Sequence, residues 1–184
     1  MVETEHTPNP NTLKFLPGKK VSEIGPIEFL KTDKSITIPL ANKILSLEGT
    51  EMVFFGVDFI TVKKRKDLNW DSLKYGIISE INDYYSRGNE VVIKKESEKS
   101  NLKSDKDQGD EIVNKINEIL DSRIRPAVAK DGGDIKFKSF KDGVVLVELK
   151  GSCSGCPSSI MTLKQGVQNL LCHYIPEVKS VEAI

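Results

Sequence analysis

The sequence predicts an α+β protein built from two small α/β domains that a flexible charged linker joins. The linker is residues 95–109, where Leu102 is the one apolar side chain, so this segment cannot bury enough surface to offset the entropy of ordering it. On each side of it, short apolar runs of strand length alternate with stretches whose apolar residues recur every three or four positions, as in amphipathic helices. The 184 residues suffice for two such units. We expect the two units to move independently of each other.

Residues 1–94 are expected to form the first domain, with two helices among short strands. Strand-like runs occupy residues 12–16, 27–30, 52–57, 59–63 and 90–94. The first helix begins near Pro39, because the fixed φ of proline suits a first helical position, and it ends before Gly49. The second helix is indicated by apolar and aromatic residues at three- and four-residue spacing, namely Trp70, Leu73, Ile77, Ile81 and Tyr84.

Residues 110–184 are expected to form the second domain, with the element order α-β-β-α-β. Its first helix is indicated by an apolar face of Ile112, Ile116, Ile119 and Leu120. We expect Pro126 to end this helix. Strands at 135–140 and 144–149 form a hairpin through Asp142 and Gly143, which favour a tight turn. A second helix at 157–172 and a last strand at 178–184 complete the domain.

Charge and hydropathy exclude two classes of partner. Lys+Arg and Asp+Glu both total 27, whereas a nucleic-acid-binding domain usually carries a basic surface, so we expect no nucleic acid. The basic run at 63–66 is interpreted as a solvated strand end. No apolar run approaches the roughly 20 residues of a membrane-spanning helix, and the first residues lack the pattern of a signal peptide. We expect no membrane partner and a cytoplasmic location, or the mitochondrial matrix if the source is eukaryotic and a transit peptide has been removed.

The chemistry is expected to lie in Cys153 and Cys156, which form a Cys-x-x-Cys motif between a predicted strand and a predicted helix. The partial positive charge at a helix N-terminus lowers the pKa of a cysteine, and the thiolate is the form that binds metals or attacks disulfides. By itself the motif allows a redox dithiol, half of a zinc site or half of an iron-sulfur cluster site.

Counting ligands favours a metal site that two copies of the chain share. Tetrahedral zinc and the common iron-sulfur clusters take four ligands, whereas one motif supplies two. Cys172 follows Pro157 by 15 residues, which is about 22 Å along a helix, so neither it nor His173 can join the site. His6 lies in the other domain. Cys172 is interpreted as a small apolar side chain filling space near a helix end. Two copies of the chain would supply four thiolates.

Both domains resemble known families. The resemblance to the C-terminal domain of NifU rests on Arg125-Pro126, Asp131-Gly-Gly-Asp-Ile135, Gly151-Ser-Cys-Ser-Gly-Cys-Pro-Ser-Ser159 and Thr162-Leu-Lys-Gln-Gly166. The resemblance to the N-terminal domain of Nfu-type proteins rests on Thr7-Pro-Asn-Pro-Asn-Thr-Leu-Lys-Phe-Leu-Pro-Gly18 and Val53-Phe-Phe-Gly-Val-Asp-Phe-Ile-Thr-Val62. Together the two resemblances span nearly the whole chain outside the linker.

The resemblance implies a maturation factor rather than an enzyme. Such a protein binds a [4Fe-4S] cluster across a homodimer that forms on cluster binding, with Cys153 and Cys156 as the ligands. It receives the cluster from an upstream assembly scaffold and transfers it to apo iron-sulfur client proteins, and its N-terminal domain contributes to partner choice. The chain lacks the additional segments of full-length NifU, so we expect a cluster carrier rather than an assembly scaffold.

Two other functions remain open from the residues alone. A thioredoxin-like dithiol oxidoreductase also places Cys-x-x-Cys between a strand and a helix, but the expected order here lacks a preceding βαβ unit and no aromatic residue precedes Cys153. A structural zinc site shared by two chains would use the same four thiolates. Zinc gives neither brown colour nor acid-labile sulfide, so metal and sulfide analysis separates it from a cluster.

Overall fold

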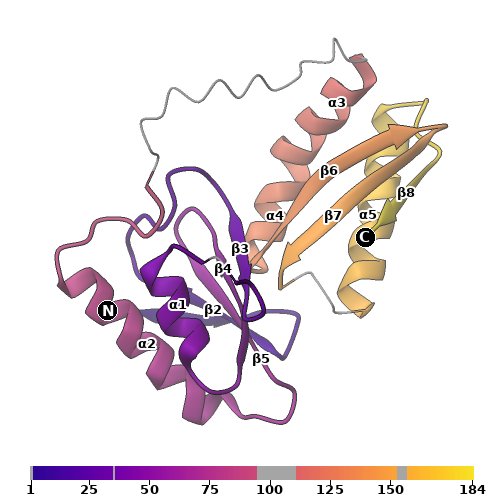
Figure 1. The fold of residues 1–184 in the computed structure, drawn as a ribbon. Coiled ribbons are helices and arrows are strands. Elements are labelled where there is room, and N and C mark those ends of the chain that lie inside the picture. Colours follow the sequence, from indigo (N-terminus) through magenta and orange to yellow (C-terminus); the bar gives the residue numbers. More distant parts are fainter. Residues whose placement is uncertain (1, 35, 95–110, 153–156) are drawn as a thin grey trace.

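The computed structural model describes residues 2–34, 36–94, 111–152 and 157–184, and for residues 157–159 it describes the backbone alone. The described residues form two sheets, each with its own helices (Figure 1). The predicted α+β class is confirmed. The predicted linker, residues 95–109, lies outside the described residues. Below, residues 2–94 are called the N-terminal half and residues 111–184 the C-terminal half.

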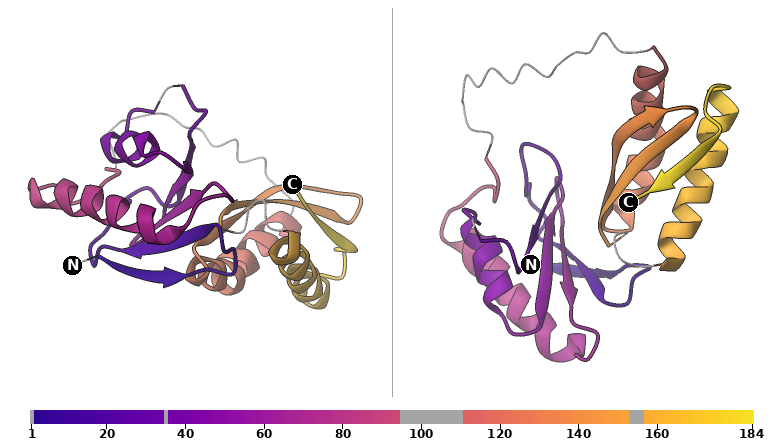
Figure 2. Two further views of the ribbon diagram at one scale, coloured as in Figure 1. Left: turned by 90° about the horizontal axis from the view of Figure 1, so that it is seen from below. Right: turned by 45° about the vertical axis from the view of Figure 1, so that its right-hand side comes forward.

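The N-terminal half contains an antiparallel sheet with the strand order β1-β2-β5-β4-β3. Its strands are β1 (Glu3–His6), β2 (Thr12–Leu16), β3 (Ile27–Leu30), β4 (Thr50–Phe55) and β5 (Ile60–Lys64). Helices α1 (Pro39–Ser46) and α2 (Trp70–Ser86) lie together on one face of this sheet (Figure 2). Both helices were predicted, and Asn69 caps α2 by accepting a hydrogen bond from the Asp71 amide.

Two strand predictions in this half differ from the structure. Strand β1 was not predicted, because its sequence Glu-Thr-Glu-His has no apolar residue to reveal an alternating pattern and it lies at the edge of the sheet. The strand expected at 90–94 is wrong, since this segment makes only an isolated bridge between Ile93 and Ser22. Its side chains Val91, Val92 and Ile93 are nevertheless buried. The apolar run therefore signalled burial rather than a strand.

From Met52 to Phe55, strand β4 is buried on both faces. Val53 and Phe55 point into the larger N-terminal core beneath the two helices. The intervening side chains contribute to a second cluster on the opposite face, called here the outer cluster, which consists of Met52, Phe54 and Phe59. Ala129 of the C-terminal half packs against the outer cluster. The N-terminal sheet is therefore covered on one face by its own helices and touched on the other by the C-terminal half.

The C-terminal half contains the sheet β6-β7-β8, in which β6 and β7 are antiparallel and β7 and β8 are parallel. Its strands are β6 (Gly133–Lys141), β7 (Val144–Gly151) and β8 (Ser180–Ala183). Its helices are α3 (Glu111–Ile119), α4 (Arg125–Lys130) and α5 (Pro157–Tyr174), and they share one core with the inner face of the sheet. The predicted order α-β-β-α-β is confirmed. The predicted hairpin turn has positive φ angles at Asp142 (53°) and Gly143 (79°).

The expectation that Pro126 ends the first helix of this half is wrong. The chain stays helical from Glu111 to Lys130, because a wider π-helical turn, Leu120–Ile124, joins α3 to α4. In this turn the Arg125 amide bonds to the Leu120 carbonyl. Pro126 then takes a position in the first turn of α4, where the fixed φ of proline is compatible with a helix. The proline therefore begins a new helical register instead of stopping the helix.

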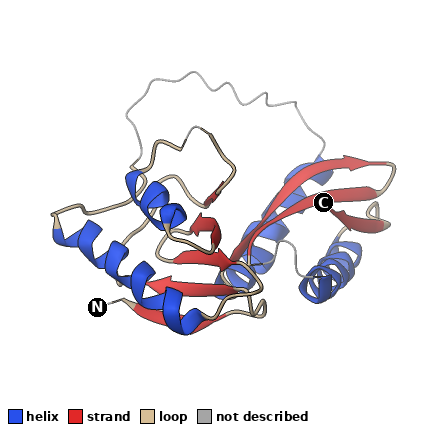
Figure 3. Ribbon diagram, turned by 60° about the horizontal axis from the view of Figure 1, so that its bottom comes forward, coloured by secondary structure: helices blue, strands red, loops and turns tan. Residues whose placement is uncertain are grey.

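The two halves are in contact in this structure. The ends of β6 and β7 nearest to α4 lie against the N-terminal sheet, and β4 contacts β7 (Figures 1 and 3). Hydrogen bonds cross between the halves, for example from the Thr61 hydroxyl to the Gly132 carbonyl at 2.8 Å. The expectation of two independently moving units does not account for these contacts. A polar linker lets two domains move apart but does not determine whether their surfaces fit each other.

Candidate functional site

The candidate ligands Cys153 and Cys156 lie outside the described residues. The structure describes what flanks them: strand β7 ends at Gly151, and helix α5 begins at Pro157. The motif thus connects the end of a strand to the N-terminus of a helix of 18 residues. Backbone N–H groups at such a terminus carry partial positive charge, which favours thiolates close to it.

The backbone that leads into the motif is joined to the Asp131–Gly133 turn. Gly133 is paired with Gly151 in the β6–β7 ladder, and beyond this pair the Ser152 amide donates to the Gly132 carbonyl at 3.2 Å. The Ser152 hydroxyl donates to the Asp131 carbonyl. Ser152 is 2% exposed, so its hydroxyl bonds to the Asp131 carbonyl rather than to water. We call residues 131–133 and 151–152 together the stem of the motif.

The stem requires glycine at Gly151. Its φ is +68°, in the left-handed region. A Cβ atom there would lie 2.6 Å from the Gly132 carbonyl oxygen and 2.9 Å from the Gly133 Cα, which are contacts too short for any side chain. Gly132 also has a positive φ, of 81°. Glycines in both parts of the stem therefore let the two backbone segments approach each other closely directly before Cys153.

Three side chains of the N-terminal half bind the backbone of the stem. One carboxylate oxygen of Glu28 accepts the Gly151 amide at 3.0 Å. The Asn9 side-chain amide donates to the Ser152 carbonyl at 3.4 Å, and the Thr61 hydroxyl donates to the Gly132 carbonyl at 2.8 Å. Sequence reasoning missed all three side chains, because no local pattern in the sequence indicates a contact between residues more than 70 positions apart.

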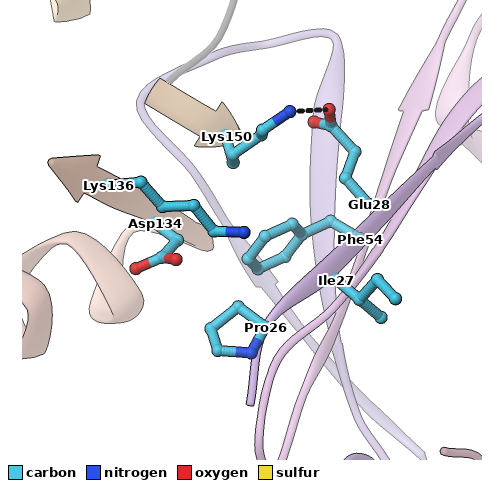
Figure 4. Close-up of a pocket in the computed structure, with 7 residues that line it drawn as sticks. All are labelled: Pro26, Ile27, Glu28, Phe54, Asp134, Lys136 and Lys150. Carbon is cyan, nitrogen blue, oxygen red and sulfur yellow. Dashed lines mark ion pairs between the residues drawn. The ribbon is translucent and has the colours of Figure 1, made fainter. Parts of the chain in front are cut away.

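Charged residues surround a small pocket beside the stem, between the two halves. The pocket has a volume of about 140 Å³, and Figure 4 shows Glu28 and Lys150 facing each other across its upper end. Their closest N–O distance is 3.6 Å, and Lys150 also bonds to Glu148 at 2.8 Å. The hydrogen bond to Glu148 is the main cause that raises the pKa of Lys150, so the ammonium form is favoured. Lys150 therefore stays cationic and pairs with carboxylates of both halves.

Asp134 follows the stem and lines the same pocket (Figure 4). It is 4% exposed, and burial raises the pKa of its carboxyl group above the usual value. A backbone hydrogen bond at Ile135 and the positive charge of Arg125, whose Nε lies 3.6 Å from the carboxylate, act in the opposite direction. Arg125 also donates to the Ile135 carbonyl at 3.0 Å. Arg125 and Asp134 are both among the residues on which the resemblance to NifU rests. Their contacts connect α4 to the first residues of β6.

The remaining sulfur and imidazole groups lie away from the motif. Helix α5 runs without interruption from Pro157 to Tyr174, which places Cys172 and His173 at its far end, and Cys172 packs against the C-terminal core as predicted. His6 is on the exposed edge strand β1. Among the residues that the structure describes, no three His, Cys, Asp or Glu side chains gather in a way that could hold a metal ion. Cys153 and Cys156 remain the predicted ligands.

Two family models match the chain. The NifU-like domain matches residues 116–182, and the N-terminal domain of the scaffold protein Nfu/NifU matches residues 2–88. The two matched segments fall on either side of the predicted linker. None of the described helices is both long and apolar enough to cross a membrane.

Relatives that match nearly the whole chain are found in animals and plants. The chain is 47% identical over 184 residues to the human protein named NFU1 iron-sulfur cluster scaffold homolog, mitochondrial, covering 100% of this chain and 71% of that protein. It is 43% identical over 183 residues to NifU-like protein 4, mitochondrial, of Arabidopsis thaliana, covering 98% of this chain and 65% of that protein. A solution structure of a NifU-like protein from Saccharomyces cerevisiae shares 32% identity, with a TM-score of 0.47, over 52% of this chain and 86% of that one.

Proposed function

The chain belongs to the Nfu family of iron-sulfur cluster scaffold proteins, and from this premise we propose that it binds a [4Fe-4S] cluster and hands it to apo-proteins. The observation that carries the proposal is the position of the Cys-x-x-Cys motif, between the end of β7 and the N-terminus of α5, in a chain of this family. The proposed ligands are Cys153 and Cys156 from each of two copies of the chain. The two copies together supply the four thiolates that a cubane cluster takes.

The proposed transfer needs no catalytic residue. A cluster held by two motifs in two chains has no covalent link between its halves, so a client's thiolates can replace one pair while the other pair still holds the cluster. Release is then a stepwise exchange of ligands, whose rate depends on access to the iron and on how firmly the ligands are positioned. The proposed homodimer forms when the cluster binds, because the site is complete only when two chains meet.

The proposed partners follow from the same role. An upstream assembly scaffold supplies the cluster, and apo iron-sulfur proteins receive it. The human and Arabidopsis relatives are named as mitochondrial proteins, so we propose the mitochondrial matrix, rather than the cytoplasm, as the compartment. Nucleic acid and membrane have no part in the proposed function.

The proposal is tested by anaerobic reconstitution with iron and sulfide, in the parent chain and in three cysteine variants. We expect Cys153→Ser and Cys156→Ser to lose the cluster, because either change leaves a symmetric dimer with two thiolates where the cluster takes four. Cys172→Ser is the matched control. It should keep the cluster and lose at most about 1 to 3 kcal/mol of stability, since it adds a hydroxyl to the half-buried end of α5.

Iron content, acid-labile sulfide and visible absorption report cluster binding, and far-UV circular dichroism reports the fold. Loss of the cluster in a folded Cys172→Ser variant would contradict the ligand assignment. Zinc bound without sulfide in the parent chain, even under strict anaerobiosis, would favour a structural zinc site. Reduction of insulin disulfides at thioredoxin-like rates would favour a dithiol oxidoreductase.

A further inference from the structure

We infer that the N-terminal half is a positioning domain for the cysteine motif, and that Asn9, Glu28 and Thr61 are the residues that carry out this positioning. They hold the backbone of the stem from which the motif departs. The inference rests on the proposed function, because it concerns how firmly the chain keeps its cluster. The inference also assigns a role to the Thr7–Asn11 segment, because the proposed cluster ligands do not involve this segment.

Glu28 reaches the stem from strand β3. Its carboxylate accepts the Gly151 amide at 3.0 Å through one oxygen, and its other oxygen lies 3.6 Å from the Lys150 ammonium. The side chain of Glu28 is 13% exposed, so the hydrogen bond is largely shielded from competing water. A hydrogen bond to a charged acceptor is stronger than one between neutral groups. Glu28 therefore fixes the backbone two residues before Cys153.

Asn9 reaches the stem from the loop between β1 and β2. The loop is folded back on itself, since the Asn9 side-chain oxygen accepts the Asn11 amide at 3.0 Å and the Thr7 hydroxyl donates to the Asn9 carbonyl at 2.9 Å. These bonds leave the Asn9 side-chain NH₂ to donate to the Ser152 carbonyl at 3.4 Å. Asn9 is 4% exposed. The Thr-Pro-Asn-Pro-Asn sequence therefore orients an amide donor toward the residue that precedes Cys153.

Thr61 binds the other part of the stem. Its side chain on β5 is fully buried, and its hydroxyl donates to the Gly132 carbonyl, which also accepts the Ser152 amide at 3.2 Å. Both donors thus converge on one carbonyl oxygen. All three contacts of the N-terminal half are made to backbone atoms of the stem. A shift of one half relative to the other would therefore displace the stem backbone itself.

Apolar packing and one further hydrogen bond join the halves around these three bonds. The outer cluster packs against Ala129, as described above. The ammonium group of Lys14 lies 4.8 Å from the centre of the Phe59 ring, 3.4 Å from a Glu5 carboxylate oxygen and 3.4 Å from the Lys130 carbonyl, to which it donates. A cation at the last carbonyl of α4 is favourable for the helix dipole. The docked arrangement is therefore supported independently of the stem contacts.

The consequence is that docking controls how firmly the cluster is held. With the halves docked, the backbone of the stem is constrained at Gly132, Gly151 and Ser152, so the point from which the motif departs is fixed. With the halves apart, the stem keeps only the bonds within the C-terminal half, and the ligand is less well positioned. A partner that separates the halves would then release the cluster faster without touching the cysteines.

The test compares Glu28 variants in the full-length chain. Glu28→Ala removes both contacts, and Glu28→Gln keeps a neutral acceptor for the Gly151 amide. Glu51→Ala is the matched control, because Glu51 is an exposed glutamate on the adjacent strand β4. Amide hydrogen exchange of Gly151 and Ser152 is measured in the apoprotein by NMR. The rate of cluster loss to an iron chelator is measured in the reconstituted protein.

We expect Glu28→Ala to speed exchange at Gly151 and cluster loss by about tenfold each, the effect of losing one charge-assisted hydrogen bond. Glu28→Gln should restore most of both rates, and Glu51→Ala should change neither. Thermal unfolding of the variants serves as the fold control. Asn9→Asp provides a second probe, since it keeps the acceptor for the Asn11 amide but turns the donor facing Ser152 into an acceptor. It should behave like Glu28→Ala.

Unchanged exchange at Gly151 and Ser152 in both Glu28→Ala and Asn9→Asp would overturn the inference, because the contacts would then not exist in solution. Faster exchange with an unchanged rate of cluster loss would also overturn it, because docking would then serve no positioning role. A parent chain that takes up no cluster would overturn the proposed function and the positioning role with it. That outcome is recognised before any variant is compared, and the exchange data would still report on docking.

Discussion

The two sheets of this protein differ in what covers their second face. In the N-terminal sheet, one face packs on α1 and α2, and the other carries the outer cluster of Met52, Phe54 and Phe59 against the C-terminal half. In the C-terminal sheet, one face packs on the helices, and the other carries charged residues such as Lys136, Glu148 and Lys150. The order of apolar and polar residues along a strand shows whether one or both faces of its sheet are covered. The run 52–55 is continuously apolar, whereas β7 alternates buried with partly exposed residues.

A strand that is apolar at every position therefore indicates packing on both of its faces. When helices cover only one face, another part of the protein must cover the other. In the N-terminal half that part is the other half of the same chain. In the C-terminal half the charged face meets the N-terminal half at the end that carries Asp134 and Lys150, and farther along it Lys138 and Glu148 stay partly exposed to water. Three substitutions test these assignments, two on the N-terminal sheet and one on the C-terminal sheet.

The largest effect is expected from Phe55→Ala, with Phe54→Ala as its matched partner on the opposite face of β4. Phe55 is 0% exposed within the N-terminal core, so its truncation should lower the free energy of unfolding of this half by about 3 to 5 kcal/mol. Phe54 is 1% exposed but faces the C-terminal half. Its truncation should cost less, because the halves can separate while both sheets stay folded.

Denaturant unfolding measures both losses, and amide exchange at Gly151 reports docking. We expect Phe54→Ala to speed that exchange while the buried amides of β4 and β5 stay protected. Equal losses of stability in the two variants, with no change in exchange at Gly151, would contradict the assignment of the outer cluster to the interface between the halves.

A smaller effect is expected from Glu148→Gln on the charged face of the C-terminal sheet. Hydrogen bonds from Lys138 (2.7 Å) and Lys150 (2.8 Å) lower the pKa of the Glu148 carboxyl group from 4.5 to about 2. Because the folded-state pKa is lowered, the stabilisation is fully present above about pH 4.5 and is lost as the pH falls toward 2. The pairs are partly exposed to water, so removing them should cost only about 0.2 to 1 kcal/mol near pH 7.

Denaturant unfolding of the parent and of Glu148→Gln is compared across this pH range. The difference between them should shrink as the pH falls from about 4.5 to about 2, and it should also shrink in high salt near pH 7. A difference that grows on acidification would show that Glu148 is not stabilised as a carboxylate in the folded protein.

Much of the fold could be predicted because its elements are marked by local patterns. Strands β2 and β3 have the predicted bounds, and α2 contains the whole run of apolar and aromatic residues, from Trp70 to Tyr84, that predicted it. Local patterns failed where the structure depends on pairing with another strand or on a change of hydrogen bonding within a helix. The edge strand β1 is defined only by its pairing with β2, and the continuation of the helix past Pro126 depends on a change of hydrogen-bond register. Neither is visible in composition or periodicity.

In the candidate site too, some features could be predicted from local sequence and others could not. Spacing alone separated Cys153 and Cys156 from Cys172, and the unbroken helix α5 agrees with that separation. The stem could not be predicted from spacing, because the approach of Gly132 to Gly151 results from strand pairing. The contributions of Glu28 and Asn9 require the docked arrangement of the halves, and a linker sequence carries no information about that arrangement.

The most direct test of the central claim, a cluster shared by two copies of the chain, is native mass spectrometry of the reconstituted protein under anaerobic conditions. We predict an apoprotein that is monomeric or weakly dimeric, and a loaded species with the mass of two chains and one [4Fe-4S] cluster, or about two irons per chain. Dilution should not release a loaded single chain. A stable species of one chain carrying one complete cluster would contradict the account.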